Sequence, residues 1–182
     1  MKRALFLDRD GILDELVFYP SHGEWESPRR VEDVQMIDGV TEPLQRLSDA
    51  GWLLFIVTNQ PSFAKGKTSL ENLHAVHEHI VQSLGVPITR SYQCFHQASD
   101  QCGCRKPNPF FLHEAAREFD VDLWRSWMVG DQDSDLACGR AAGCKVALLE
   151  HPGSAHKRGR IEPDLRVRDL AELVSAILSS RA

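Results

Sequence analysis

The stretch ALFLDRDG at residues 4–11 joins four consecutive apolar residues to two aspartates that are one residue apart. A continuous apolar run, unlike an alternating one, is typical of a strand that is buried on both faces in a parallel sheet. Similar runs occur at 52–57, 127–129 and 146–149, and segments with helical periodicity lie between them. This alternation predicts an α/β fold, a doubly wound parallel sheet with helices on both faces.

The expected helices share apolar residues spaced three and four positions apart. They cover 41–50, 69–84, 109–119, 134–143 and 170–178. Thr68, with Glu71 three residues later, is expected to cap the second of them. Residues 151–160, HPGSAHKRGR, are expected to form an exposed loop after the fourth strand.

Length and composition fit a single domain that spans 1–182. The chain has 21 Lys+Arg against 26 Asp+Glu, and without a basic stripe it offers no electrostatic case for binding nucleic acid. No run of 18 apolar residues occurs, and the apolar run near the start is too short for a signal-peptide core. We therefore expect a soluble cytoplasmic protein without a membrane partner, and a monomer.

Polar clusters follow the expected strands, at the ends where open α/β sheets bind their ligands. These clusters are DRDG at 8–11, TNQ at 58–60, RKP at 105–107 and GDQDSD at 130–135. Any one of them is a weak signal, because Asp-x-Asp is most often a solvated turn. Four such clusters in this order favour a catalytic site.

A second group of polar residues is concentrated in one short segment and consists of three cysteines and one histidine, Cys94, His96, Cys102 and Cys104. Four ligands of this kind with no open position are typical of a structural, tetrahedral zinc site. The alternative is that the cysteines are simply reduced and buried, as is common in the cytosol. The paired spacings and the histidine favour a zinc-binding loop.

The motifs FLDRDG, VTNQ, CRKP and MVGDQDSD together resemble the four signature motifs of the haloacid dehalogenase superfamily of phosphohydrolases. DRDG with TNQ, the Cys-x-His and Cys-x-Cys pairs and RKP resembles, more narrowly, the phosphatases of D-glycero-D-manno-heptose 1,7-bisphosphate and their sister group, the histidinol-phosphate phosphatases. The resemblance implies a Rossmann-like fold of the haloacid dehalogenase type and the activity of a phosphoric monoester hydrolase.

The resemblance also implies a role for each motif residue. Asp8 would attack phosphorus and form an aspartyl-phosphate, and Asp10 would act as general acid and base. A Mg²⁺ ion would be held by the side chains of Asp8 and Asp131 and by the backbone carbonyl of Asp10. Thr58 and Lys106 match the residues that hold the phosphoryl oxygens.

Other polar residues near the motifs are expected to have supporting roles. Asn59, Gln60, Arg105 and Tyr19 are the candidates for substrate contact. Asp135 is expected to support the metal ligands. Asp133 is expected to cap the following helix or to face solvent.

The intervals between the motifs are too short for a large cap domain, so short loops must frame the site. The expected loops are 12–38, 61–67 and the zinc loop. The cations that could reach a second phosphate, or that could be solvated loop charges, are Arg9, Arg29, Arg30, Lys65, Lys67 and Arg105. An open site of this kind suits a small phosphorylated sugar or a related metabolite.

Two function classes follow. The first is a Mg²⁺-dependent phosphomonoesterase with structural zinc that removes the C7 phosphate of heptose 1,7-bisphosphate. Histidinol phosphate or another small sugar phosphate is the alternative substrate, and transfer to an alcohol in place of water would make the enzyme a phosphotransferase. The second class is a catalytically silent, zinc-stabilised binding protein, which would be expected to have lost at least one of Asp8, Asp10, Lys106 and Asp131. All four are present.

Overall fold

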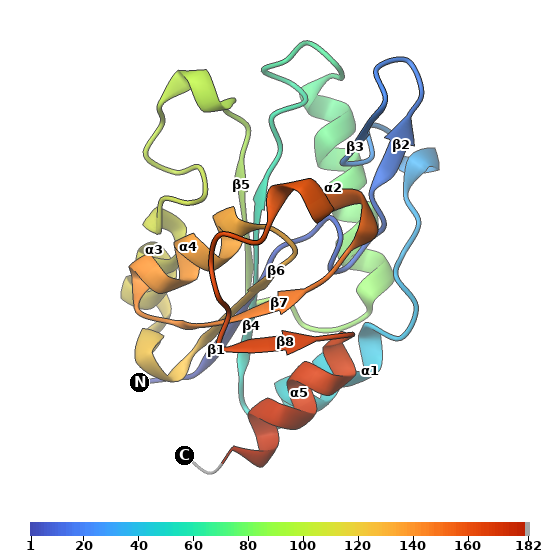
Figure 1. Ribbon diagram of the computed structural model, residues 1–182. Helices are drawn as coiled ribbons and strands as arrows, with labels where there is room; N and C mark the ends of the chain where they lie inside the picture. The colour runs from blue at the N-terminus through green and yellow to red at the C-terminus, as the bar shows by residue number, and fades with distance from the viewer. Residues whose placement is uncertain (181–182) are drawn as a thin grey trace.

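The structure is a computed structural model that describes residues 1–180. Its centre is a six-stranded sheet in the order β5-β4-β1-β6-β7-β8, in which every pair is parallel (Figure 1). The strands are β1 (Ala4–Leu7), β4 (Leu53–Asn59), β5 (Arg90–Cys94), β6 (Trp127–Gly130), β7 (Lys145–Leu149) and β8 (Leu165–Val167). The four strands expected from apolar runs are confirmed, and they lie at the centre of the sheet.

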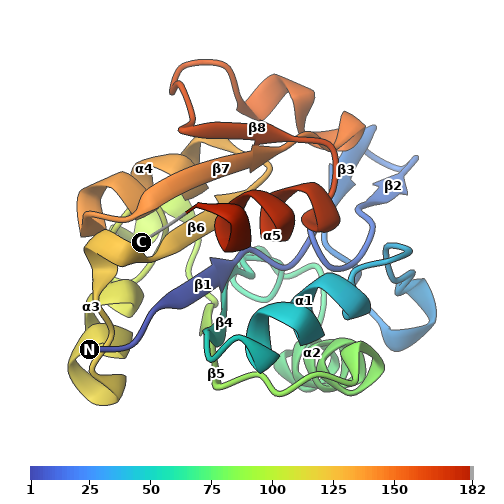
Figure 2. The same ribbon diagram turned by 90° about the horizontal axis from the view of Figure 1, so that it is seen from below.

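Helices cover both faces of this sheet, which confirms the doubly wound arrangement (Figure 2). One face carries α1 (Thr41–Asp49), α2 (Leu70–Leu84) and α5 (Leu170–Ser179), and the other carries α3 (Phe110–Phe119) and α4 (Asp133–Ala142). Strand β1 serves both layers, because Leu5 and Leu7 pack into one core whereas Ala4 and Phe6 pack into the other. No helix within residues 1–180 is both long enough and apolar enough to cross a membrane.

Two strands of this sheet that the sequence did not reveal, β5 and β8, form its edges. Their sequences, RSYQC and LRV, lack a continuous apolar run because an edge strand is only partly buried. The cap of α2 also differs from expectation. Ser69 Oγ accepts a hydrogen bond from the Asn72 N–H at 3.1 Å, whereas Thr68 donates its hydroxyl to the Arg29 carbonyl at 2.9 Å.

The segment between β1 and α1 contains an antiparallel hairpin and one turn of 3-10 helix, not a large cap domain. The hairpin pairs β2 (Val17–Tyr19) with β3 (Glu24–Glu26), and η1 (Val31–Asp33) follows it. In Figure 1 this hairpin stands at the same end of the sheet as the loop after β4 and the loop after β5. The sheet therefore presents the carboxyl ends of its central strands to a ring of short segments.

The segment after β7 differs from the exposed loop that its composition predicts. It forms a 3-10 helix, η4 (Pro152–Lys157), and lies over the same end of the sheet (Figure 1). His151, Gly153 and Ser154 are buried. The other short helices are η2 (Ala98–Asp100) and η3 (Leu123–Arg125).

Candidate active site

A cavity of about 410 Å³ opens at the carboxyl ends of the central strands, within the size range of small-molecule sites. Asp8 directly follows β1, and its N–H donates to the Val129 carbonyl of neighbouring β6 at 2.9 Å. Asp131 follows β6, and Thr58 is near the end of β4 on the other side of β1. Because the three strands are neighbours, motifs more than a hundred residues apart meet at one point.

Lys106 reaches this point from the segment before α3 and is 3% exposed. Its Nζ lies 2.8 Å from Asp8 Oδ1 and 2.7 Å from Asp135 Oδ1, and it donates to the Val57 carbonyl at 2.7 Å. Burial alone would lower the pKa of Lys106, but Asp135 and Asp8 raise it above its ordinary value. The ammonium group therefore stays charged at the base of the cavity.

Asp8, Asp131 and Asp135 form a carboxylate cluster, with one oxygen from each lying within 4.8 Å of the others. Burial, followed by the charge of Asp135, raises the pKa of Asp8 to about 7. Burial, followed by the charge of Asp8, raises the pKa of Asp131 to about 6. Both carboxylate oxygens of Asp131 are buried without a hydrogen-bond partner among the described residues.

The carboxylate cluster therefore carries more negative charge than Lys106 neutralises. Carboxylate oxygens are the ligands that Mg²⁺ prefers in proteins. The unpartnered oxygens of Asp131, beside Asp8, fit a divalent cation that would supply the missing positive charge.

Two glycines allow the backbone to pass close to these carboxylates. A Cβ on Gly11, whose φ is +85°, would lie 2.7 Å from Asp131 Oδ2. A Cβ on Gly130 would lie 2.2 Å from the Cβ of Asp135. The glycines of the DRDG and GDQDSD motifs are thus required by the packing of the site itself.

Asp10 is held by hydrogen bonds to both of its carboxylate oxygens. Arg9 donates to Oδ1 from Nη2 at 2.7 Å and from Nε at 3.2 Å, while Gln60 Nε2 donates to Oδ2 at 2.5 Å. Thr58 Oγ1 donates to Oδ2 at 3.4 Å and accepts from Gln60 at 2.9 Å. Burial raises the pKa of Asp10, but the charge of Arg9 and the hydrogen bonds from Arg9, Ser27 and Gln60 together outweigh burial, and the net shift is downward.

These contacts change the expected roles of two residues. Arg9 is fully buried and lies 3.8 Å from Asp14 as well as against Asp10, so it cannot reach a second phosphate. Gln60 is also fully buried and does not line the cavity. Its amide orients Asp10 from behind, where it has no contact with the space a substrate would occupy.

Asn59 and Arg105 line the cavity, but both also make contacts within the protein. Asn59 accepts a hydrogen bond from the Lys106 N–H at 3.1 Å and donates to the Lys106 carbonyl at 3.2 Å, which fixes the RKP segment against β4. Arg105 Nη1 donates to the His96 carbonyl at 3.0 Å. Arg105 thus joins the cavity to the cysteine-rich loop.

Tyr19 does not line the cavity. The Arg29 guanidinium lies 3.8 Å from the centre of its ring and donates to Glu26 at 2.6 Å. Lys67 also donates to Glu26. Tyr19, Arg29 and Lys67 therefore stabilise the hairpin and hold Glu26, an arrangement that leaves neither cation free to reach a second phosphate.

Of the remaining expected cations, one is paired with a carboxylate and one lines the cavity. Arg30 pairs with Asp33 at 3.4 Å, whereas Lys65 lines the cavity. His156 and Lys157 of η4 also line it, and the sequence interpretation missed them. One signal could have found them, because they follow the buried strand 146–149, and ligands bind beyond the carboxyl ends of such strands.

Asp133 and Asp135, at the start of α4, have different partners. The Asp133 carboxylate accepts from the backbone N–H groups of Gly159 at 3.2 Å, Arg160 at 3.0 Å and Ile161 at 3.3 Å. It anchors the segment after η4 and does not cap the helix or face only solvent. Asp135 accepts from the Gln132 N–H at 3.1 Å and pairs with Lys106 at 2.7 Å, and its expected support of the metal ligands stays a prediction.

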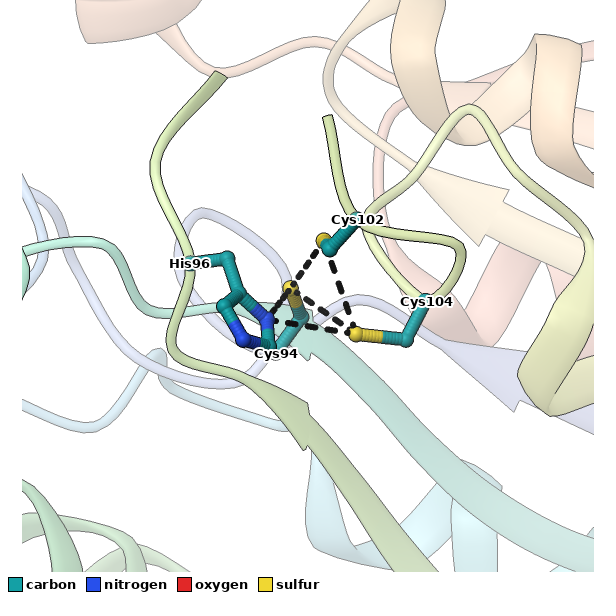
Figure 3. Close-up of side chains that lie close together, drawn as sticks. All are labelled: Cys94, His96, Cys102 and Cys104. Atoms are coloured by element: carbon teal, nitrogen blue, oxygen red, sulfur yellow. Dashed lines mark hydrogen bonds between the residues drawn. The ribbon is translucent and has the colours of Figure 1, made fainter. Parts of the chain in front are cut away.

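The cysteine-rich loop brings its four candidate ligands together as the sulfur cluster, Cys94, His96, Cys102 and Cys104 (Figure 3). Cys94 Sγ lies 3.4 Å from Cys104 Sγ and 3.6 Å from Cys102 Sγ. His96 Nδ1 lies 3.5 Å from Cys104 Sγ and 3.6 Å from Cys94 Sγ.

These separations match a tetrahedral metal site. Ligands bound to zinc at about 2.3 Å for sulfur and about 2.0–2.1 Å for nitrogen are about 3.5–3.8 Å apart. A disulfide would require a sulfur–sulfur distance of about 2.05 Å, and the cysteines are free. The sulfur cluster can therefore hold one metal ion without rearrangement.

The chain is similar in sequence to several known proteins. A family model described as HAD-hydrolase-like matches residues 103–173. The D-glycero-beta-D-manno-heptose-1,7-bisphosphate 7-phosphatase of Haemophilus ducreyi is 35% identical, covering 95% of this chain and 97% of that protein. The enzyme of the same name from Pseudomonas aeruginosa is 34% identical, with coverage of 97% and 98%.

Solved structures include the D,D-heptose 1,7-bisphosphate phosphatase from B. bronchiseptica in complex with magnesium and phosphate. It is 28% identical and superimposes with a TM-score of 0.83, covering 100% of both chains. The chain thus belongs to the haloacid dehalogenase-like hydrolases and, within them, to the family of the heptose-1,7-bisphosphate 7-phosphatases, which are phosphoric monoester hydrolases.

Proposed function

We propose that the chain is a Mg²⁺-dependent phosphatase that removes the C7 phosphate of D-glycero-D-manno-heptose 1,7-bisphosphate through an aspartyl-phosphate on Asp8. The observation that carries this proposal is the placement of Asp8 at the base of a cavity, against Lys106 and within the carboxylate cluster. The names of the relatives support the choice of substrate.

Hydrogen bonding distinguishes the two oxygens of Asp8. Oδ1 accepts from Lys106 Nζ at 2.8 Å and from the Arg9 N–H at 2.7 Å. Oδ2 is therefore the oxygen that we assign to attack on phosphorus. As the bond from Oδ2 to phosphorus forms, the bond from phosphorus to the C7 oxygen breaks, and Asp10, which must first take up a proton from solvent, gives that proton to the leaving oxygen.

The second half of the reaction uses the same residues. Asp10 accepts a proton from water, the water oxygen bonds to phosphorus, and the bond to Asp8 Oδ2 breaks to release phosphate. Lys106 carries positive charge beside the phosphoryl oxygens in both steps, and Thr58 supplies a hydroxyl next to Asp10. Gln60 and Arg9 keep the Asp10 side chain in place.

The side chains of Asp8 and Asp131, with the Asp10 carbonyl, are the ligands that we propose for Mg²⁺. When bound, the ion would neutralise the charge of the carboxylates and of the phosphoryl group. The magnesium in the B. bronchiseptica structure supports the choice of this ion. The unpartnered oxygens of Asp131 support it from this chain.

We also propose that the sulfur cluster holds a structural zinc ion. The four ligand atoms occupy four positions, so none is left open for a substrate. Zinc there would fix the loop that leads directly into Arg105 and Lys106. Its contribution to catalysis would be to position these two residues.

A phosphate-release screen tests the proposed function. Heptose 1,7-bisphosphate, heptose 7-phosphate, histidinol phosphate and unrelated sugar phosphates would be compared with and without Mg²⁺, with Asp8→Asn as the control for contaminating phosphatase. We expect the highest kcat/KM on the bisphosphate and turnover only with Mg²⁺. A clear preference for histidinol phosphate would overturn the substrate and leave the chemistry of Asp8 standing.

A further inference from the structure

The cations of the cavity fall into two groups according to their partners. Lys106 is ion-paired with Asp8 and Asp135 at the base. Within residues 1–180, no carboxylate oxygen lies within 4.0 Å of the charged nitrogens of the other cations that line the cavity, Lys65, Arg105 and Lys157. These three positive charges are available to an anionic ligand.

The segment that carries Lys157, residues 151–161, is attached firmly to the rest of the site. His151 Nε2 lies 2.7 Å from Glu15 Oε2, and its Nδ1 accepts from the Gly153 N–H at 3.0 Å. Ser154 Oγ donates to the Asp131 carbonyl at 3.3 Å. The segment is thereby tied to the backbone of a residue of the carboxylate cluster.

Arg158 and Asp133 make further hydrogen bonds that hold residues 151–161 in place. Arg158 Nη1 donates to the His151 carbonyl at 2.7 Å and to Ser154 Oγ at 3.0 Å. Asp133 binds the N–H groups of the three residues that follow Arg158. A hydrogen-bonded frame therefore surrounds His156 and Lys157, which are themselves exposed.

The hairpin packs against this frame from the other side. A Cβ on Gly153 would lie 2.9 Å from the Trp25 ring, so only glycine allows the observed approach. Trp25, Glu24 and Glu26 line the same cavity as His156 and Lys157. Lys67 already lies against both glutamates and Arg29 against Glu26, so Lys157 remains available to a phosphate at this rim.

Depth separates the two ends of the cavity. Lys106, beside the proposed nucleophile, is 3% exposed, whereas His156 and Lys157 are exposed at the rim. A phosphate that reacts with Asp8 must therefore lie at the base. A second phosphate on the same sugar would extend toward the rim.

We propose that Lys157, together with His156, binds the phosphate that does not react, and so helps to select sugar bisphosphates over monophosphates. The proposal rests on the proposed function and adds a specificity-determining element to it. Lys157 offers three N–H donors and a full positive charge, and the His156 ring offers a further N–H donor.

The test compares kcat/KM for heptose 1,7-bisphosphate and heptose 7-phosphate in Lys157→Gln. We expect a loss of about tenfold on the bisphosphate, the scale of one charge-assisted hydrogen bond, and a loss of less than about threefold on the monophosphate. The loss should appear mainly in KM. Lys157→Arg should restore most of it, because the positive charge returns.

Arg160→Gln is the matched control. It removes the same charge from the same segment, but the Arg160 side chain does not line the cavity. The control should alter both substrates by less than about twofold.

The outcomes separate this inference from the proposed function. If the wild type prefers the bisphosphate but Lys157→Gln lowers both substrates equally, or neither, the inference alone is overturned. If the wild type hydrolyses neither sugar phosphate, the proposed substrate fails and this inference fails with it.

Discussion

The sulfur cluster and the carboxylate cluster are both groups of side chains that could hold a metal ion near the carboxyl edge of the sheet, but the chain assembles them differently. The sulfur cluster comes from residues 94–104, the end of β5 and the loop that follows it. The carboxylate cluster takes Asp8 from the end of β1, Asp131 from the end of β6 and Asp135 from the first turn of α4.

The first cluster can be specified by a short stretch of sequence, whereas the second forms only when the sheet brings distant residues together. Ligands in one loop can close around a metal without the rest of the fold, and that metal then stabilises the loop. Carboxylates that are buried together repel one another, and here the pairing of β1 with β6 and the ammonium group of Lys106 keep them close. We therefore expect changes in one cluster to leave the other largely intact.

The largest expected effect is that of Asp8→Asn, which should abolish turnover. The amide keeps the shape of the side chain but is not nucleophilic. Phosphate release would be measured alongside zinc content and circular dichroism, both of which should match the wild type. Substantial residual activity in the purified variant would remove Asp8 from the role of nucleophile.

Asp10→Asn should lower kcat by at least about 10²-fold, the usual scale of general acid–base assistance. Asparagine has nearly the same size as aspartate and still forms hydrogen bonds, so substrate KM should change much less than kcat. Steady-state kinetics on heptose 1,7-bisphosphate would measure both parameters. A loss confined to KM would contradict the assignment of Asp10 as acid and base.

Arg105 joins the two clusters, because it lines the cavity and donates to the carbonyl of His96. Arg105→Ala should weaken kcat/KM on a sugar bisphosphate by roughly 1.5–3 kcal/mol, the range for a charge-assisted hydrogen bond. A monophosphate should lose appreciably less. Equal losses on both substrates would show that Arg105 serves the reacting phosphate.

The smallest expected effect lies outside both clusters, at Glu26 of the hairpin. Burial raises the pKa of Glu26, but hydrogen bonds from Lys67 and Arg29 outweigh it and lower the pKa to about 2, from an ordinary 4.5. A lowered pKa in the folded state adds stability that is complete above pH 4.5 and is lost as the pH falls toward 2.

Glu26→Gln should therefore lower the free energy of unfolding by about 1–2 kcal/mol at pH 7, and by less at pH 3.5. Urea unfolding at both pH values would measure the difference. A destabilisation that is the same at both values would show that the carboxylate charge contributes nothing.

Much of the site could be predicted because its motifs follow buried strands. The apolar runs before Asp8 and Asp131 predict that both residues lie at strand ends, and the spacing of the cysteines and the histidine predicts the sulfur cluster. Arg9 could not be placed in this way. An arginine between two aspartates is expected in solvent, and only the folding of the loop onto Asp10 and Asp14 buries it.

The segments whose structure the sequence did not predict have one property in common, which is that their apolar residues show no clear periodicity or continuous run. Strands β5 and β8 are edges, so their sequences do not show a continuous apolar run. Residues 151–161 are polar and rich in glycine and basic residues, yet long-range contacts to Glu15, Asp131 and Asp133 order them. Contacts between distant segments are not visible in composition.

The most direct test of two separate metal sites is a Mg²⁺ titration of phosphate release, using protein washed with a weak chelator and analysed for zinc in the same sample. Mg²⁺ bound by few protein oxygens should be removed, whereas zinc with four protein ligands should stay. We predict about one zinc per chain, no turnover before Mg²⁺ is added and full turnover afterwards. A zinc content near zero, or turnover that survives without Mg²⁺, would contradict the account.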